Sequence, residues 1–308
     1  MAQQNRWGVI YSSNPGIFRA NKRWKQIRQY IEQKGIQYDF VQSEAFGSVE
    51  RLTGMLCENG YKTIVLVGDD GALYDAINAI MNHRDILHSD FAFGVIPYGI
   101  GHDYARFWGL SSDDYQDAIN RILDRKTRKI DVGYISYTNN DIDEKRYFLN
   151  CINIGLGARL VKITNDMLRL TGSNIFSVIP ILVRRVFERK SFDLKFQIET
   201  EVVDGEYMSV CIGNCLGYGQ TPNSVPYNGM VDVTTVTRPQ WWQLIEGFWL
   251  LGKGRFLNYK NVHPYRAQSV KVIDIERAFL TLDGRELSIK RPTPFVVGVE
   301  SEVVNFII

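Results

Sequence analysis

The chain has 308 residues, of which 45% are hydrophobic and 23% are charged, and its formal net charge is +2. This composition is that of a globular protein long enough to bury one large core or two ordinary ones, and the small net charge argues against a nucleic acid as a partner. The N-terminus lacks the apolar segment of a signal peptide, and no apolar run approaches the roughly 20 residues that span a bilayer, so we expect a cytoplasmic protein.

The first half of the chain alternates between short apolar strands and amphipathic helices. The expected strands are residues 7–13, 36–41 and 93–96, and the expected helices are residues 19–33, 49–59 and 115–123. Asn14-Pro15-Gly16 is a strong turn signal that closes the first strand. Strands and helices that alternate at this spacing predict βαβ units and a mainly parallel sheet.

The stretch from Thr63 to Ala72 joins a buried strand to a helix through the turn Gly68-Asp69-Asp70-Gly71. Such a turn favours phosphate, because backbone N–H groups and the positive end of the helix dipole face the ligand. Two aspartates are unusual there, since carboxylates repel phosphate unless Mg²⁺ or hydrogen bonds intervene. The pattern therefore predicts a phosphate site with an unusual charge.

The second half of the chain is rich in strands and turns. The expected strands are residues 147–154, 192–203, 206–213, 230–237, 269–276, 278–282 and 295–299. Asp204-Gly205 and Asp283-Gly284 are hairpin signals between them. The expected helices are residues 157–170, 176–189 and 241–251. We therefore predict an α/β N-terminal domain with a mainly parallel sheet (residues 1–128) and a C-terminal β-rich sandwich or barrel (residues 129–308). Whether the last strands return to the first domain is left open.

Three motifs, in this order along the chain, carry a resemblance to a known family. Residues 68–72 match the pattern G-G-D-G-T, residues 97–106 (P-Y-G-I-G-H-D-Y-A-R) match P-x-G-T-G-N-D-F-A-R, and Asp283-Gly284-Arg285, with Glu286 one place late, matches D-G-E. The chain thus resembles the diacylglycerol kinase catalytic family, which includes bacterial lipid kinases and sphingosine kinases and shares its fold with NAD kinases.

The resemblance implies transfer of the ATP γ-phosphate to a lipid hydroxyl with the help of Mg²⁺. It implies that Asp283 is the catalytic base. The nucleotide-binding residues that it implies are Asn14, Gly68, Asp70, Gly71, Gly99, Gly101, Asp103 and Glu286. The carboxylates that it places around the metal, through water, are Asp70, Asp103 and Asp131. Diacylglycerol is the first acceptor to consider and a sphingoid base or related lipid alcohol the next, drawn from the inner face of a membrane. A homodimer is left open.

Simpler interpretations of the same residues stay open beside these roles. Asp283-Gly284 is also the pattern of a type I′ hairpin turn. Asp70 and Asp103 also suit capping of the helices that start beside them.

At the end that meets the phosphates, the chain departs from the family pattern at four positions, Asp69, Ala72, Ile100 and His102. Two hydroxyl donors are lost and one carboxylate is gained where the family meets nucleotide phosphates, so we expect weak nucleotide affinity. These changes leave a second hypothesis, a relative without phosphoryl transfer that binds lipid or a partner protein. A third, an NAD kinase, is disfavoured because residues 103–106 follow the lipid-kinase pattern.

Residues 241–256 (W-W-Q-L-I-E-G-F-W-L-L-G-K-G-R-F) combine aromatic side chains with cations at helical spacing. This combination suits a membrane interface, while the alternative is a core helix packed on the β-rich domain. The basic, apolar residues 175–190 suit the same surface or an acyl-chain cleft.

Overall fold

The computed structural model describes residues 6–12, 18–44, 47–99, 101–139, 141–171, 179–275, 279–287 and 294–308. These residues form two compact units. The first comprises Met1–Ile130 with Glu302–Ile308, and the second comprises Asp131–Ser301. The last seven residues thus belong with the first unit.

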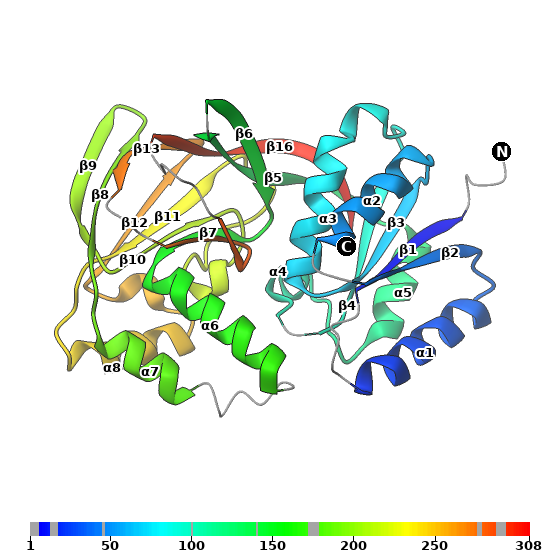
Figure 1. The fold of residues 1–308 in the computed structure, drawn as a ribbon, viewed down its shortest axis with the longest axis horizontal. Helices are drawn as coiled ribbons and strands as arrows, with labels where there is room; N and C mark the ends of the chain where they lie inside the picture. Colours follow the sequence, from blue (N-terminus) through cyan, green and yellow to red (C-terminus); the bar gives the residue numbers. More distant parts are fainter. Residues whose placement is uncertain are drawn as a thin grey trace. The chain divides into compact units, whose positions relative to one another are not determined.

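The first unit contains four strands and the helices between them (Figure 1). The strands are β1 (Trp7–Ser12), β2 (Tyr38–Ser43), β3 (Thr63–Gly68) and β4 (Ala92–Pro97). The helices are α1 (Phe18–Gln33), α2 (Ser48–Glu58), α3 (Asp70–Asn82), α4 (Asp103–Phe107) and α5 (Tyr115–Asp124), with a short 3₁₀ turn η1 (Arg84–Ile86).

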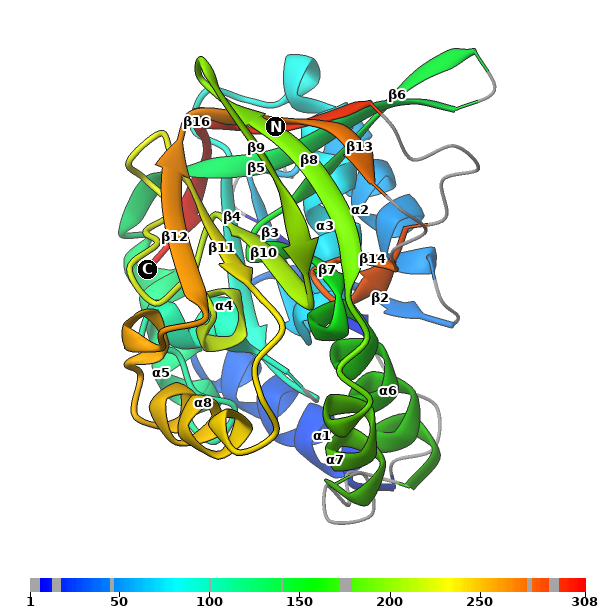
Figure 2. The same ribbon diagram turned by 90° about the vertical axis from the view of Figure 1, so that its left-hand side faces the viewer.

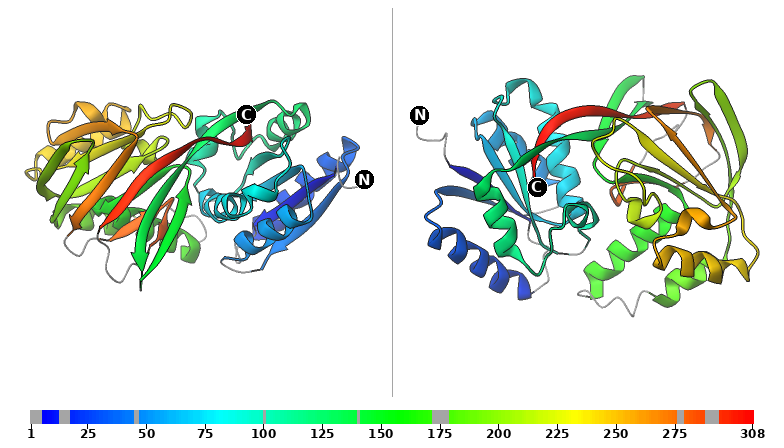
Figure 3. Two further views of the ribbon diagram at one scale, coloured as in Figure 1. Left: turned by 90° about the horizontal axis from the view of Figure 1, so that it is seen from above. Right: turned by 180° about the vertical axis from the view of Figure 1, so that it is seen from behind.

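The strands of the first unit pair in the order β2-β1-β3-β4, and all of these pairs are parallel. All six residues of β3 are buried, as expected of a central strand of a parallel sheet covered on both faces. The end of β16 (Phe295–Ile307) extends this sheet, since Phe306 pairs in parallel with Phe93 of β4 (Figure 3). The carboxyl ends of β3 and β4 therefore lie side by side.

The second unit is built from antiparallel strands with three helices. Its strands are β5 (Thr127–Asn139, which starts in the first unit), β6 (Ile142–Phe148), β7 (Cys151–Gly155), β8 (Phe192–Ile198), β9 (Glu201–Tyr207), β10 (Ser209–Gly213), β11 (Val231–Val236), β12 (Val262–Ala267), β13 (Ser269–Ile275), β14 (Leu280–Leu282), β15 (Arg285–Glu286) and the start of β16. Its helices are α6 (Leu156–Thr171), α7 (Ile179–Phe187) and α8 (Gln243–Gly252), with 3₁₀ turns η3 (Gly217–Gly219) and η4 (Phe256–Asn258).

These strands form two sheets. One has the order β12-β11-β10-β7-β14-β15, and the other joins β16, β13, β8 and β9, with β5 beside β16 and β6 beside β5 (Figure 2). The predicted fold class, an α/β domain with a mostly parallel sheet followed by an antiparallel β sandwich, is confirmed. Within the described part, no helix is both long and apolar enough to cross a membrane.

One of the two hairpin predictions is wrong. Asp204-Gly205 lies inside β9, where Gly205 pairs with Leu194. The turn is at residues 199–200, and Glu199 has a φ of 52°. The buried side chains of β8 continue their alternation to Ile198, so the hydrophobic pattern outweighs the local turn preference.

Candidate active site

In the turn after β3, an aspartate side chain binds a backbone N–H at the start of the next helix. Asp69 is the N-cap of α3, and its Oδ1 accepts the backbone N–H of Ala72 at 3.0 Å. One of the donors that a phosphate would use is thus already bound to a charged side chain. This carboxylate also adds a negative charge at the positive end of the helix dipole.

Asp70, the next residue, ties this turn to the one after β4. Its Oδ2 accepts the backbone N–H of Asp103, the first residue of α4, at 2.8 Å, and its own N–H donates to the carbonyl of Gly101. Asp70 therefore caps α4 and not α3, the helix that starts beside it, so the capping alternative as expected is wrong for Asp70. Asp103 does not cap a helix. It pairs with Arg106, with 3.1 Å between Oδ1 and Nη1, so the capping alternative is wrong for Asp103.

The glycines of the two turns differ in conformation. Gly99 and Gly101 have φ values of 104° and 83°, which only glycine adopts without strain. Gly68 ends β3, and Gly71 lies in the first turn of α3. These four glycines lie with Asp70 and Asp103 in two adjoining turns. Two other positions of interest, Asn14 and Ile100, lie outside the described residues.

His102 precedes α4 without capping it. Burial, and then the charge of Arg106, lower the pKa of its imidazole. Its buried Nδ1 makes no hydrogen bond within the described residues. A neutral imidazole therefore stands where the family pattern has an asparagine.

Asp283, the expected base, lies in the hairpin turn between β14 and β15. Asp283 and Gly284 both have positive φ (45° and 82°), as a type I′ turn requires. The buried carboxylate accepts three backbone N–H groups, that of Leu149 at 2.7 Å, that of Asn150 at 3.0 Å and that of Cys151 at 2.9 Å. Burial raises the pKa of Asp283 to about 6, although these three donors lower it. The group is thus a carboxylate at neutral pH whose proton affinity is higher than usual.

Asp131 is fully buried in β5. Its Oδ2 accepts the N–H of Gly229 at 2.6 Å, and its N–H donates to the carbonyl of Pro226. The side chain of Asn214 donates to the carbonyls of both Asp131 and Leu149. Asp131 thus holds the loop before β11 and is connected through Asn214 to the backbone that binds Asp283.

Glu286 lies two residues beyond the Asp283-Gly284 turn, at the end of β15, where it forms an ion pair with Lys162 of α6. Both side chains are 40% exposed. This contact gives Glu286 a surface partner close to Asp283.

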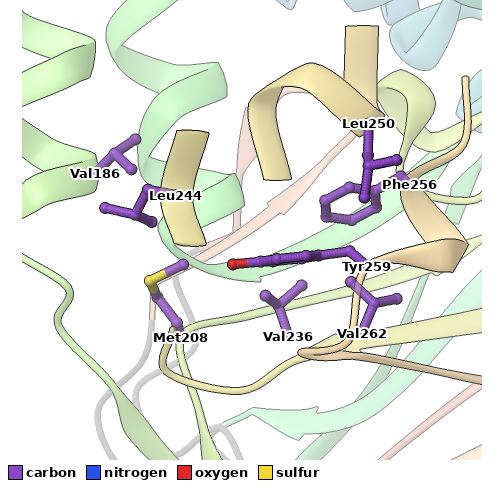
Figure 4. Packing of buried hydrophobic residues seen from close by; sticks show 8 residues of the cluster. All are labelled: Val186, Met208, Val236, Leu244, Leu250, Phe256, Tyr259 and Val262. Carbon is purple, nitrogen blue, oxygen red and sulfur yellow. The ribbon is translucent and has the colours of Figure 1, made fainter. Parts of the chain in front are cut away.

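An apolar cavity of about 220 Å³ lies within the second unit. Its walls come from α6, α7, α8, η4 and neighbouring strands, and they include Leu160, Val186, Met208, Leu244 and Phe256. Figure 4 shows the cluster of buried hydrophobic residues at this cavity. Val186 lies beside Leu244, and the ring of Tyr259 lies between the helices and the sheet. The cavity is large enough for part of a hydrocarbon chain.

Polar side chains connect this cavity to Asp283. Gln220, which lines the cavity, donates to Oδ1 of Asn153 at 2.8 Å, and Asn153 donates to the sulfur of Cys151. The N–H of Cys151 binds Asp283. A Cβ on Gly157, at the start of α6, would meet Asn153 Oδ1 at 3.1 Å, so glycine lets the helix approach this polar row closely. Strand β7 thus runs from the carboxylate to the cavity.

The expected role of Asp70, Asp103 and Asp131 around a metal, through water, stays a prediction. Among the described residues, no group of three or more His, Cys, Asp and Glu residues is arranged to hold a metal ion. Asp70 and Asp131 each direct one carboxylate oxygen to a backbone N–H.

The sequence did not single out Asn153, Asn214 and Gln220 as site residues. The only signal was the run N-C-I-N-I-G-L-G from Asn150, which places two amides at a strand and a glycine at the start of a helix. The acyl-chain cleft that the sequence suggested for residues 175–190 agrees with the cavity only at Val186, because the other walls come from segments that lie far apart along the chain.

Models of two protein families match the chain. The diacylglycerol kinase catalytic domain matches residues 6–135, and the YegS C-terminal NAD kinase beta sandwich-like domain matches residues 150–307.

Curated relatives match at low identity over most of their length. A diacylglycerol kinase of Bacillus subtilis (strain 168) is 23% identical over 284 residues, which are 90% of this chain and 88% of the relative. A probable lipid kinase YegS-like of Alcanivorax borkumensis is 26% identical over 264 residues, which are 84% and 78% of the two chains. The crystal structure of a putative diacylglycerol kinase from Bacillus anthracis str. Sterne has a TM-score of 0.73 at 17% identity and covers 98% of this chain and 97% of that one, which shows a shared fold.

Proposed function

Because the chain belongs to the diacylglycerol kinase catalytic domain family, we propose that it transfers the γ-phosphate of ATP to the hydroxyl of a membrane lipid. Diacylglycerol is the first acceptor to test, and a sphingoid base or related lipid alcohol is the second. The observation that carries the proposal is the apolar cavity connected by Gln220, Asn153 and Cys151 to the buried carboxylate of Asp283.

In the proposed complex, an acyl chain of the lipid lies in the cavity, and the head group with its hydroxyl lies along β7 towards Asp283. Gln220 and Asn153 supply amide groups for the glycerol oxygens. A cavity without charged walls suits hydrocarbon, since burial of each CH₂ group contributes about 0.8 kcal/mol. This arrangement favours a lipid over a water-soluble alcohol.

In the reaction, the lipid hydroxyl oxygen bonds to the γ-phosphorus, and the bond from this phosphorus to the β,γ-bridging oxygen breaks. ADP leaves with the electron pair, and the hydroxyl proton passes to Asp283. A pKa of about 6 suits this role, because the carboxylate is ionised at neutral pH and binds a proton more tightly than an ordinary aspartate does. The three N–H groups fix its position.

The phosphates of ATP are assigned to the turns after β3 and β4. The N-terminus of α3 is their natural site, but Asp69 occupies one of its donors. We therefore propose weak nucleotide affinity. Magnesium arrives with the nucleotide, since the described residues offer it no cluster of ligands.

The experiment uses labelled ATP, Mg²⁺ and mixed lipid vesicles with the purified full chain. Labelled phospholipid is expected, and Asp283→Asn should lower its formation by a factor of about 10² or more, in the range seen for general bases. Asp274→Asn is the matched control, because among the described residues this carboxylate accepts a hydrogen bond from the neighbouring backbone N–H of Ile275. Absence of ATP binding by calorimetry at millimolar ATP would overturn the proposal.

A second function, a relative that binds lipid without phosphoryl transfer, is favoured by one observation. The two carboxylates of the turn after β3 cap the helices α3 and α4. Lipid binding without any ATP binding would support it. The model that matches the first half of the chain is a diacylglycerol kinase catalytic domain, and the two curated relatives are a diacylglycerol kinase and a probable lipid kinase, so we do not propose NAD kinase activity.

A further inference from the structure

Helix α8 is apolar on both of its faces. Leu244, Gly247 and Leu250 are buried against the second unit, and a Cβ on Gly247 would meet the ring of Tyr259 at 3.1 Å. Away from this buried face, Ile245, Phe248 and Trp249 of the helix and Trp241 and Trp242, which directly precede it, are 50–68% exposed. One face of α8 is thus packed against the second unit, and apolar side chains on its other face remain exposed. The fold therefore leaves part of the apolar surface of this helix unburied.

Helix α7 repeats this arrangement. Its Val186 is buried in the same cluster as Leu244 and Leu250 of α8 (Figure 4). Its exposed apolar residues, 37–50% exposed, are Ile179, Ile181, Val183 and Phe187. The outer faces of the two helices, residues 179–187 and 241–249, are called the apolar face below.

The charges around the apolar face are mostly positive. Residues 179–190 and 238–260 contain eight Lys and Arg residues and two Glu residues, Glu188 and Glu246. Glu188 is paired with Arg185 at 3.0 Å. These two segments carry six net positive charges in a chain whose net charge is +2, so the rest of the chain is net negative.

We infer that the apolar face docks onto the surface of a bilayer that contains anionic phospholipid. Tryptophan side chains suit the membrane–water interface, and each cation near an anionic surface contributes to attraction. The described helices are too short to span the bilayer, so α7 and α8 lie in its interface. A second copy of the chain fits less well, because a two-fold interface would set this positive surface against itself.

Phe248 connects this surface to the cavity. It is 50% exposed on the apolar face, and it also lines the cavity between the helices and the sheet. Docking would therefore bring the bilayer to the wall of the cavity. This last step rests on the proposed function, whereas the docking itself does not.

The test measures sedimentation of the full chain with vesicles of phosphatidylcholine alone or with 30% phosphatidylglycerol. Binding to the anionic vesicles should be at least about tenfold tighter and should weaken with added salt. Replacing all three exposed tryptophans by serine should weaken it by about tenfold or more, since each large apolar side chain contributes on the order of a factor of ten. Ile142→Ser/Val202→Ser, at exposed apolar residues of β6 and β9, is the control.

Brominated lipids give a second measurement. The other three tryptophans, Trp7, Trp24 and Trp108, lie in the first unit, and Trp7 and Trp24 are buried. Quenching of fluorescence by bromine on the acyl chains should therefore disappear in the triple variant. Equal vesicle binding by the triple variant, or a dimer that becomes monomeric in that variant without vesicle binding by the parent, would overturn the inference.

Phosphorylation of a short-chain diacylglycerol in detergent micelles separates the two proposals. Micelle activity retained by a protein that does not bind anionic vesicles would overturn docking and support the kinase. Vesicle binding by the parent, lost in the triple variant, would support docking even when no lipid is phosphorylated.

Discussion

The carboxylate of Asp70 accepts the backbone N–H of Asp103 at 2.8 Å, so a residue that ends one βα turn caps the helix of the next. With Asp69 on the N-terminus of α3, two adjacent acidic side chains satisfy donors at the start of two helices. The two turns that we propose for the phosphates of ATP are therefore joined by negatively charged side chains, and ATP is itself negatively charged.

Removing the charge of Asp69 should tighten ATP binding. We expect Asp69→Gly and Asp69→Asn to bind ATP about tenfold more tightly by calorimetry, because one unit charge near a phosphate costs on the order of 1 kcal/mol or more. Asparagine keeps the cap and removes only the charge. Asp113→Asn, at a side chain that is 97% exposed, is the control. Unchanged affinity in both variants would mean that the phosphates bind away from α3.

Asp70 and Asp103 should differ in their contribution to stability. Asp70→Ala removes the cap of α4 and should lower the free energy of unfolding by about 1 kcal/mol. Asp103→Ala removes only the pair with the exposed Arg106, worth about 0.5 kcal/mol or less. Denaturant unfolding of the two variants compares them directly. Equal losses would contradict the assignment of the cap to Asp70.

Asp283 should give stability and activity opposite pH dependences. Its folded pKa of about 6 lies above the usual 3.8, so its contribution to stability is complete below about pH 3.8 and is lost as the pH rises through 6. Relative to Asp283→Asn, the free energy of unfolding should fall by about 3 kcal/mol across this range. Activity should instead rise through pH 6 as the carboxylate ionises. If the parent and Asp283→Asn had the same pH dependence of unfolding free energy and of activity, Asp283 would cause neither of these dependences.

We expect Asp131 to contribute to the stability of the fold and not to the Mg²⁺ dependence of activity. Asp131→Ala removes the acceptor of the part-buried N–H of Gly229 and should lower the free energy of unfolding by about 1 kcal/mol. Asp131→Asn keeps an acceptor and should cost less. The dependence of activity on Mg²⁺ concentration should be the same in Asp131→Asn as in the parent. A different dependence on Mg²⁺ concentration in Asp131→Asn would support the metal role that the resemblance implies for Asp131.

Filling the cavity should raise the KM for the lipid and leave the KM for ATP unchanged. Leu160→Trp places a large side chain into the space of about 220 Å³. It should raise the KM for a long-chain diacylglycerol by about tenfold, the equivalent of about 1.4 kcal/mol of lost contact, with no change in the KM for ATP. Ile142→Trp, on an exposed strand, is the control. Unchanged lipid kinetics would mean that the acyl chain binds elsewhere.

The local features of the fold were predictable where periodicity and turn chemistry agree. The expected helix at residues 115–123 is α5 (Tyr115–Asp124), and the Asp283-Gly284 turn joins β14 and β15. The strand expected at residues 147–154 is instead broken at residues 149–150, where the N–H groups turn towards Asp283. That break depends on a partner more than 130 residues away, and no local pattern encodes it.

The site was predictable only in part for the same reason. The sequence marked Asp70 as a polar residue of a phosphate turn, but its partner at Asp103 follows from the pairing of β3 with β4. The roles of Asn214 and Gln220 likewise depend on strands brought together by the sheet. Motifs name residue types, whereas tertiary pairing decides whether a carboxylate faces a ligand or a backbone N–H.

Strand β16 sets an order for the biogenesis of this protein. Its start pairs with β13 in the second unit, and Phe306, near its end, pairs with Phe93 in the first. During synthesis, residues 1–130 are made before residues 302–308, so the sheet of the first unit is completed only after the second unit has been made. A fragment that stops at Ile130 would leave the edge of β4 open to pairing with other chains, and removal of residues 302–308 would weaken the first unit rather than the second.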